Sequence, residues 1–91
     1  MNVFMHDKEK SNSNQEKHGI DFELAQAVWL DSDALIAEAK HIEDEKRFMI
    51  VGKIKGKLWS VIFTHRKESI RIISARRARK EEANYYEKNK G

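Results

Sequence analysis

The sequence has no cysteine and no proline, and it has four glycines among its 91 residues. Without cysteine the chain can form no disulfide framework, no thiolate metal site and no cysteine nucleophile. The absence of proline disfavours a proline-rich linker or recognition tail. The glycines stand at 19, 52, 56 and 91, and this distribution excludes a glycine-rich phosphate loop.

Long apolar segments are also missing. No apolar run approaches the roughly 18 residues of a membrane-spanning helix, and the first ten residues lack the apolar stretch of a secretory signal. We therefore expect a cytoplasmic protein without a membrane segment. Apolar residues make up 40% and charged residues 36% of the chain, a balance typical of a folded globular domain. A chain of this length suffices for one domain, so we predict a single domain over residues 1–91.

Positive charge is concentrated in the C-terminal part of the chain. Residues 1–52 hold 6 Lys or Arg against 11 Asp or Glu, whereas residues 53–91 hold 12 against 4. The net charge of +3 therefore hides a strongly basic half. Such a half predicts a phosphate-bearing or otherwise acidic partner, and the alternative is that Lys and Arg only solvate one side.

The first half of the chain is typical of short helices. The apolar residues 3–4 can form a short strand. Residues 11–19 predict one or two helical turns, with Ser13 and Glu16 as a capping box and Gly19 as the terminator.

A second helix is predicted after Asp21, whose side chain is a good N-terminal cap. It would bury one apolar stripe, made of Phe22, Ala25, Val28 and Trp29. Residues 34–39 fit either a strand or a helical turn.

The pattern changes to strands in the second half. Residues 47–54, 57–65 and 69–75 are rich in β-branched and aromatic side chains, and short polar segments separate them. The charged residues from 75 to 89 predict a C-terminal helix, with Ser74 as its candidate cap. We expect an α+β fold: an antiparallel sheet of three to four strands with N-terminal helices and a C-terminal helix.

Alternation along the predicted strands separates two faces of the sheet. Trp59, Val61 and Phe63 share one face, which we expect to be core. The other face would combine hydroxyls and arginines with the apolar residues Ile62, Ile70 and Ile72. A chain this short has too few helices to cover both faces, so we expect a partner or ligand on the mixed face.

Three segments of the chain together resemble one family. They are KHGIDFELAQAVW near the start, HIEDEKRFMIVGKIKGKLWSVIFTHR in the middle and IRIISARRARKEEANYYE at the end. In order and spacing they are similar to the BrnT proteins, which are ribonuclease toxins of bacterial type II toxin–antitoxin pairs.

The resemblance implies a fold like that of RelE-type toxins and an endoribonuclease activity that cleaves cellular RNA and inhibits growth. It also implies a BrnA-type antitoxin, encoded beside the toxin, which neutralises it and supplies DNA binding and repression of the shared operon. The alternative function is a non-catalytic module that only binds nucleic acid or the antitoxin.

The residues themselves suggest cleavage without a metal or cofactor. The four histidines form no HExxH pattern and no carboxylate triad at ligand spacing. RNA carries its own nucleophile, because the 2′-hydroxyl can attack the neighbouring phosphorus. The enzyme then needs a base, an acid and cations for the phosphorane oxygens.

Arginine suits the cationic role because its planar fork grips phosphate and keeps its charge. The family resemblance favours Arg66, Arg76 and Arg77 as catalytic cations. Arg47 and Lys57 are candidates for substrate binding. Taken singly, each of these could be an ordinary surface charge.

Four residues are candidates for proton transfer or substrate contact. Glu45 could be a base or a salt-bridge partner. Tyr86 could contact substrate, the role that we favour, or pack on the sheet. His18 and His65 are candidates because an imidazole can donate or accept a proton. However, His18 precedes a helix-ending glycine, and His65 alternates onto the core face. The sequence therefore leaves the acid–base pair open.

Overall fold

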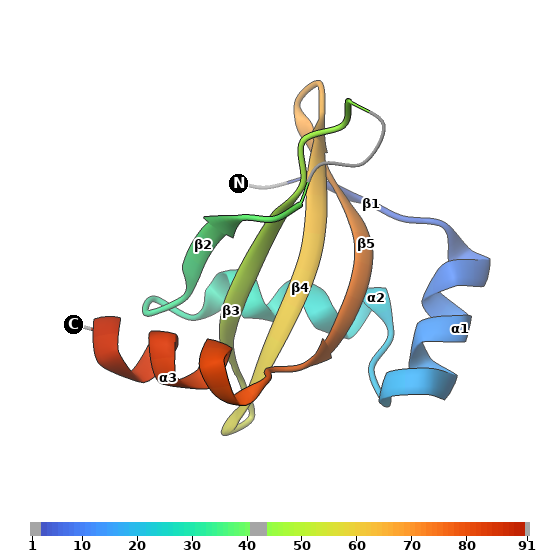
Figure 1. Ribbon diagram of the computed structural model, residues 1–91. Coiled ribbons are helices and arrows are strands. Elements are labelled where there is room, and N and C mark those ends of the chain that lie inside the picture. Colours follow the sequence, from blue (N-terminus) through green and yellow to red (C-terminus); the bar gives the residue numbers. More distant parts are fainter. Residues whose placement is uncertain (1–2, 41–43, 91) are drawn as a thin grey trace.

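A five-stranded sheet forms the centre of the protein (Figure 1). The structure is a computed structural model, and it describes residues 3–40 and 44–90. The strands lie in the order β1-β5-β4-β3-β2. Their bounds are β1 Val3–Met5, β2 Leu35–Glu38, β3 Phe48–Ile54, β4 Lys57–Arg66 and β5 Ser69–Arg77.

The sheet is mixed and larger than the sequence predicted. Strands β2 to β5 pair antiparallel, as expected. The β3–β4 turn has left-handed backbone at Lys55 and Gly56, with φ of 49° and 81°, which matches the twist of a tight hairpin. β1 adds to the edge of β5 in parallel. The expected α+β class is confirmed. The predicted antiparallel sheet of three to four strands is present as β2 to β5, but the sheet is mixed, because the short strand expected at residues 3–4 joins it as a fifth, parallel strand.

The helices are α1 (Lys8–His18), α2 (Phe22–Ala25), the 3₁₀ helix η1 (Gln26–Leu30) and α3 (Lys80–Asn89). Asp7 caps α1, since its Oδ1 accepts hydrogen bonds from the backbone N–H of Glu9 at 2.8 Å and of Lys10 at 3.2 Å. The predicted capping box of Ser13 and Glu16 is therefore wrong, because α1 starts earlier and Ser13 lies in its middle.

Three other helix-end predictions can be compared with the structure. Gly19 ends α1 in the left-handed conformation, with φ of 76°. Asp21 caps α2 by accepting from the Leu24 N–H at 2.8 Å. Both predictions are confirmed. Ser74 does not cap α3, because β5 continues to Arg77 and α3 begins later.

The main core lies between the rear face of the sheet and α2 with η1, which Figure 1 shows behind the strands, whereas α3 lies in front. Phe22, Ala25 and Val28 meet Val61 and Phe63 there, each at most 1% exposed. The predicted apolar stripe and core face are thus confirmed at these positions.

A close approach of η1 to β3 explains the glycine in the middle of that strand. A Cβ atom on Gly52 would lie 2.8 Å from Cγ1 of Val28. Any larger residue would therefore push the helix away from the sheet.

A register shift between β4 and β5 changes the predicted faces. Ile62 pairs with Ser74 but Phe63 pairs with Ile72, so Ile73 is an extra residue in β5. As a result Ile70 and Ile72 point into the core, at 7% and 2% exposure. The prediction that these two isoleucines lie on the mixed face is wrong.

Helix α1 contains no apolar residue. Hydrogen bonds hold it at the edge of β5 near Ala75, past the three residues of β5 that pair with β1. The buried Asn14 amide donates to Ile20 O at 2.7 Å and to Ala75 O at 2.8 Å, and its Oδ1 accepts from Ala75 N at 3.2 Å. Ser11 Oγ accepts from Phe22 N at 2.9 Å. These side chains replace the partner strand that this part of β5 lacks.

Substitution Asn14→Ala should therefore lower the free energy of unfolding by roughly 3 kcal/mol, because it leaves buried backbone groups without partners. Urea denaturation measures the change. The matched control is Asn12→Ala, an exposed position on the same helix, which should change stability by less than about 0.5 kcal/mol. Equal effects of the two substitutions would show that Asn14 does not anchor α1.

Candidate functional site

Arg47 and Arg66 meet around one carboxylate at the end of β4. Arg66 Nη2 lies 2.7 Å from Glu45 Oε2, and Arg47 Nε lies 3.8 Å from Glu45 Oε1. Thr64 fixes this arrangement, because its buried hydroxyl donates to Lys46 O at 2.7 Å and ties the segment before β3 to β4. The structure thus brings together three of the residues that the sequence suggested.

Two further cations line the same hollow, which has a volume of about 150 Å³. Arg71 comes from β5, where it pairs across the sheet with Thr64. Lys10 comes from α1. We call Lys10, Arg47, Arg66 and Arg71 the cation cluster. Sequence reasoning missed Lys10 and Arg71, although strand alternation places Arg71 opposite the core residue Ile70.

The Arg47 guanidinium carries an unused donor inside this cluster. Its Nε is buried and makes no hydrogen bond within residues 3–40 and 44–90. A buried donor without an acceptor is costly. With four cations around a single carboxylate, the hollow favours an anion with several oxygens, such as a phosphate.

A larger hollow of about 630 Å³ lies beside the cluster. Arg66 and Arg71 contribute to both hollows, and Val3 and Met5 give the larger one an apolar wall. The cluster is therefore open to solvent between two concave surfaces, which leaves room for a ligand longer than one phosphate.

The two candidate histidines lie on opposite sides of this region. His65 packs against Phe48 and Phe63, with ring centroids 5.3 and 5.6 Å away, on the core side of the sheet. This confirms the face predicted by alternation. His18 ends α1 and lines a separate hollow together with Lys10 and Lys17. Neither histidine lines the hollow of the cation cluster.

The remaining predicted cations lie at the other end of the sheet. Arg76 pairs with Ser60, six residues before Arg66 along β4, which corresponds to roughly 20 Å at about 3.3 Å per residue. Lys57 opens β4 at that same far end. The structure therefore does not join Arg76, Arg77 and Lys57 with Arg66.

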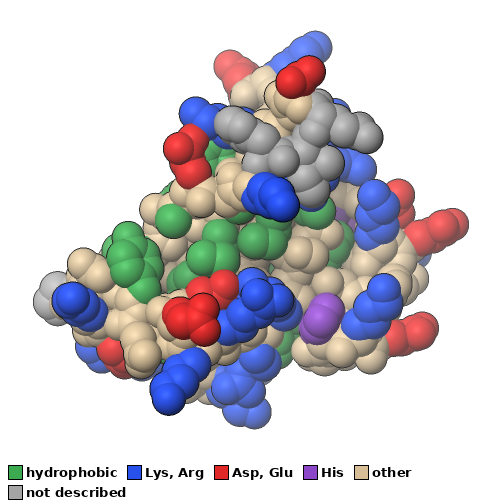
Figure 2. Space-filling model, viewed as in Figure 1, with side chains coloured by type: hydrophobic (Ala, Val, Ile, Leu, Met, Phe, Trp, Pro, Cys, Tyr) green, Lys and Arg blue, Asp and Glu red, His purple; other side chains and the backbone are tan. Residues whose placement is uncertain are grey.

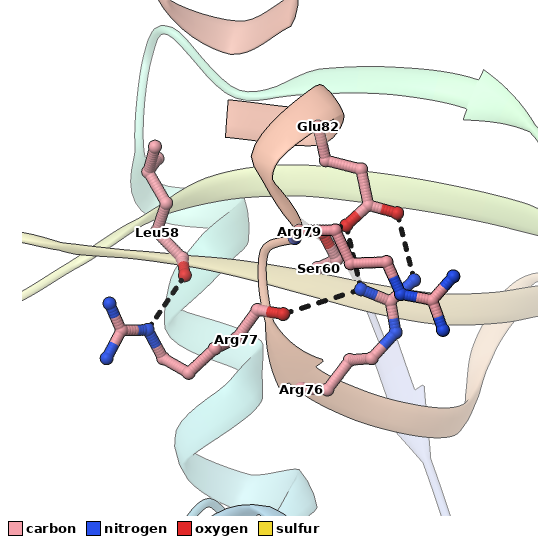
Figure 3. A network of polar contacts seen from close by, with 6 residues as sticks. All are labelled: Leu58, Ser60, Arg76, Arg77, Arg79 and Glu82. Carbon is pink, nitrogen blue, oxygen red and sulfur yellow. Dashed lines mark hydrogen bonds and ion pairs between the residues drawn. The ribbon is translucent and has the colours of Figure 1, made fainter. Parts of the chain in front are cut away.

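Arg76 is engaged by a carboxylate of α3. Figure 3 shows the two side chains pointing toward each other, with Nη1 and Nη2 of Arg76 at 2.7 and 2.9 Å from the oxygens of Glu82. Glu82 also accepts from Ser60 Oγ and from the Arg79 N–H, both at 2.8 Å. The hydrogen bonds from Arg76 lower the pKa of Glu82 to about 2 and raise that of Arg76.

Arg77 points away from this contact, as Figure 3 shows. Its Nε donates to Leu58 O at 3.3 Å, and its guanidinium lies 5.5 Å from the centre of the Trp59 ring. Arg77 is exposed on the opposite side of β5 from Arg76.

Tyr86 fastens α3 to the rest of the protein. The side chain is 2% exposed, and its hydroxyl donates to Asp31 Oδ2 at 2.7 Å. Burial, with the hydrogen bond to Asp31, raises the pKa of Tyr86 to about 12. Of the two roles that the sequence left open, the structure places this residue in packing on the sheet and not on an accessible surface.

The described part of the chain holds neither a metal-binding group of side chains nor a membrane-spanning helix. Within residues 3–40 and 44–90, no three His, Asp and Glu side chains are grouped so as to hold a metal ion. In the same residues no helix has the length and apolar character needed to cross a membrane.

The fold and the cation cluster define a small α+β protein with a basic hollow, and comparison with known proteins gives the family. The model of the BrnT family, described as the ribonuclease toxin of type II toxin–antitoxin systems, matches residues 6–82. The chain belongs to this family. The match includes every residue of the cation cluster and ends before Tyr86. A comparison with curated proteins gave no significant match.

The Glu82 contacts predict a pH-dependent anchor for α3. The folded-state pKa of about 2 lies below the ordinary 4.5, so the stabilisation is present above about pH 4.5 and is lost as the pH falls toward 2. The stability difference between wild type and Glu82→Gln should shrink by roughly 2 to 3 kcal/mol between pH 6 and pH 2.5.

Urea denaturation across this pH range tests the prediction. Glu81→Gln removes an exposed carboxylate from the same helical turn and serves as the control. If both variants show the same pH dependence, the Arg76–Glu82 contact does not anchor α3.

Proposed function

We propose that residues 1–91 form one toxin domain that cleaves cellular RNA without a metal ion, and that its cation cluster holds the phosphate that is cleaved. The observation that carries this proposal is the pairing of Arg47 and Arg66 with the Glu45 carboxylate in a hollow that Arg71 also lines. Membership of a ribonuclease toxin family supports the choice of RNA over other phosphate ligands.

The cleavage step needs the RNA substrate, solvent water and the side chains of Glu45 and the cation cluster. The RNA 2′-oxygen forms a bond to the adjacent phosphorus, and the bond from phosphorus to the 5′-oxygen breaks. The Glu45 carboxylate accepts the 2′-hydroxyl proton, while the guanidinium groups stabilise the extra negative charge on the phosphorane oxygens. The departing 5′-oxygen takes a proton from solvent water, so the products would end in a 2′,3′-cyclic phosphate and a 5′-hydroxyl.

The proposal separates residues that the sequence grouped together. Arg76 and Tyr86 belong to the attachment of α3, because their polar groups are engaged by Glu82 and Asp31. Arg77 and Lys57 lie at the same distant end of the sheet. None of these four side chains can reach a phosphate bound at Arg66 in this structure. His18 and His65 are left out of the chemical step because neither lines the cluster hollow.

We further propose that a BrnA-type antitoxin neutralises the protein by covering the cation cluster, and that it supplies the DNA binding and autorepression of the pair. Ile62 and Ile73 are half-buried, and Ile73 lines the hollow of the cation cluster. They offer an apolar contact, whereas Ile70 and Ile72 are already buried in the core. We also propose that the protein acts in the cytoplasm, where it would inhibit growth by cleaving cellular RNA. The similarity to RelE-type toxins stays a prediction.

Purified protein should cleave RNA in the presence of EDTA. Arg66→Ala and Arg47→Ala should each lower the cleavage rate at saturating RNA by about 100-fold, because each removes a cation from the transition state. Gel analysis of labelled RNA measures the rate and identifies the cyclic phosphate. Replacing the attacking 2′-hydroxyl with hydrogen should abolish cleavage at that position.

Two further variants locate the reaction on the sheet. Arg79→Ala removes an exposed arginine at the far end and should keep the wild-type rate. Arg76→Ala should be less stable yet still active below its unfolding temperature. If Arg76→Ala is folded but inactive, the cleaved phosphate lies at the α3 end of the sheet and our proposal is wrong. If wild type binds RNA without cleaving it, the non-catalytic module is supported instead.

The antitoxin proposal predicts where amide hydrogen exchange slows on binding of the antitoxin encoded beside the toxin. Protection should increase at the end of β4 and in β5 around Ile73, because these segments carry the arginines and the apolar contact. Added salt should weaken the complex if ion pairs steer it. Protection confined to residues 3–40 would contradict masking of the cluster.

A further inference from the structure

Helix α1 presents one face to a second hollow. Lys10, Ser13, Asn14 and Lys17 follow the i, i+3, i+4, i+7 spacing of one helical face. With His18, and with Ile73 and Ser74 from β5, they line a hollow of about 210 Å³. We call this hollow the α1 groove. A helix without apolar residues gains little from burial, and the hydrogen bonds of Asn14 and Ser11 hold it against β5 instead.

Asn14 fixes the orientation of this face. Its three hydrogen bonds to Ile20 and Ala75 leave α1 no freedom to roll on the sheet. Lys10 and Lys17 therefore flank Asn14 on the groove side. Among the residues that the structure describes, those lining the groove include two lysines and a histidine but no carboxylate, so its charge favours an anionic ligand.

The α1 groove continues into the hollow of the cation cluster. Lys10 and Ile73 line both, so a ligand can pass from one to the other without leaving the surface. Lys17 lies seven residues after Lys10, about 10 Å farther along the helix. Together the two hollows offer five Lys or Arg side chains and one carboxylate.

The lining favours nucleic acid over an acidic protein segment. Beside the lysines it offers the hydroxyls of Ser13 and Ser74 and the imidazole of His18, which suit phosphate, sugar and base edges. Figure 2 shows apolar side chains of this face gathered over the middle of the sheet, with Lys and Arg side chains around them and on the α1 side. A protein partner would gain more from the apolar region.

We propose that the α1 groove binds the single-stranded RNA that flanks the cleaved phosphate, with Lys17 contacting a backbone phosphate one or more nucleotides away. This inference rests on the ribonuclease function proposed above. The groove then contributes affinity for longer RNA and takes no part in the chemical step.

Binding of a single-stranded 2′-fluoro oligonucleotide tests the groove without cleavage, because this RNA analogue lacks the attacking hydroxyl. Lys17→Gln should weaken binding roughly 3- to 10-fold and reduce the slope of log K against log salt by about 0.7, the value for one phosphate contact on a single strand. Lys8→Gln is the matched control, since Lys8 is an exposed lysine of α1 that lines neither hollow. It should change neither quantity.

Cleavage assays separate this proposal from the proposed function. Lys17→Gln should raise KM for long RNA, leave kcat unchanged and have no effect on a dinucleotide substrate. If Lys17→Gln and Lys8→Gln bind the 2′-fluoro RNA equally and both cleave RNA normally, the groove proposal is wrong and the proposed ribonuclease function still stands. Loss of antitoxin affinity without loss of RNA affinity would also overturn it. Failure of wild type to cleave any RNA would overturn the ribonuclease function, while the binding comparison would still decide the groove.

Discussion

The extra residue in β5 opposite the junction of Ile62 and Phe63 decides which side chains reach each face of the sheet. Before it, Ile70 and Ile72 point into the core and Arg71 points to the front. After it, Ala75 returns to the core while Ser74 and Arg76 face forward. Without this bulge a single β5 strand could not bury both Ile72 and Ala75. The cation cluster and the α3 anchor both depend on this change of register.

The sheet consequently has two polar ends with different chemistry. At one end lies the cation cluster, where the described lining residues include three arginines, Lys10 and the single carboxylate of Glu45, and Arg47 keeps a buried donor that no described residue satisfies. At the other end Arg76 and Glu82 neutralise each other through two hydrogen bonds. A paired arginine holds structure, whereas a cluster with excess positive charge attracts a ligand. The same residue type therefore has two roles within one strand pair.

The sequence was sufficient for features that depend on local pattern: the three long strands, the Asp21 cap, the Gly19 terminator and the core face of Val61 and Phe63. It was insufficient for features set by pairing over long distances. The bulge moved Ile70 and Ile72 into the core, and β1 joined the sheet through only three residues. Proximity of Glu45, Arg47 and Arg66 could be proposed from strand ends, but Lys10 and Arg71 required the position of α1 and the register of β5.

The central claim is that the cleaved phosphate sits among Arg47, Arg66 and Arg71, and arginine side-chain NMR tests it most directly. Titration with 2′-fluoro RNA should shift the Nε–H resonances of these three arginines first, with the largest change at Arg47, whose Nε has no acceptor within the described residues. The resonances of Arg76 and Arg77 should stay in place. Shifts confined to Arg76 and Arg77 would contradict the account, because they would put the phosphate at the α3 end of the sheet.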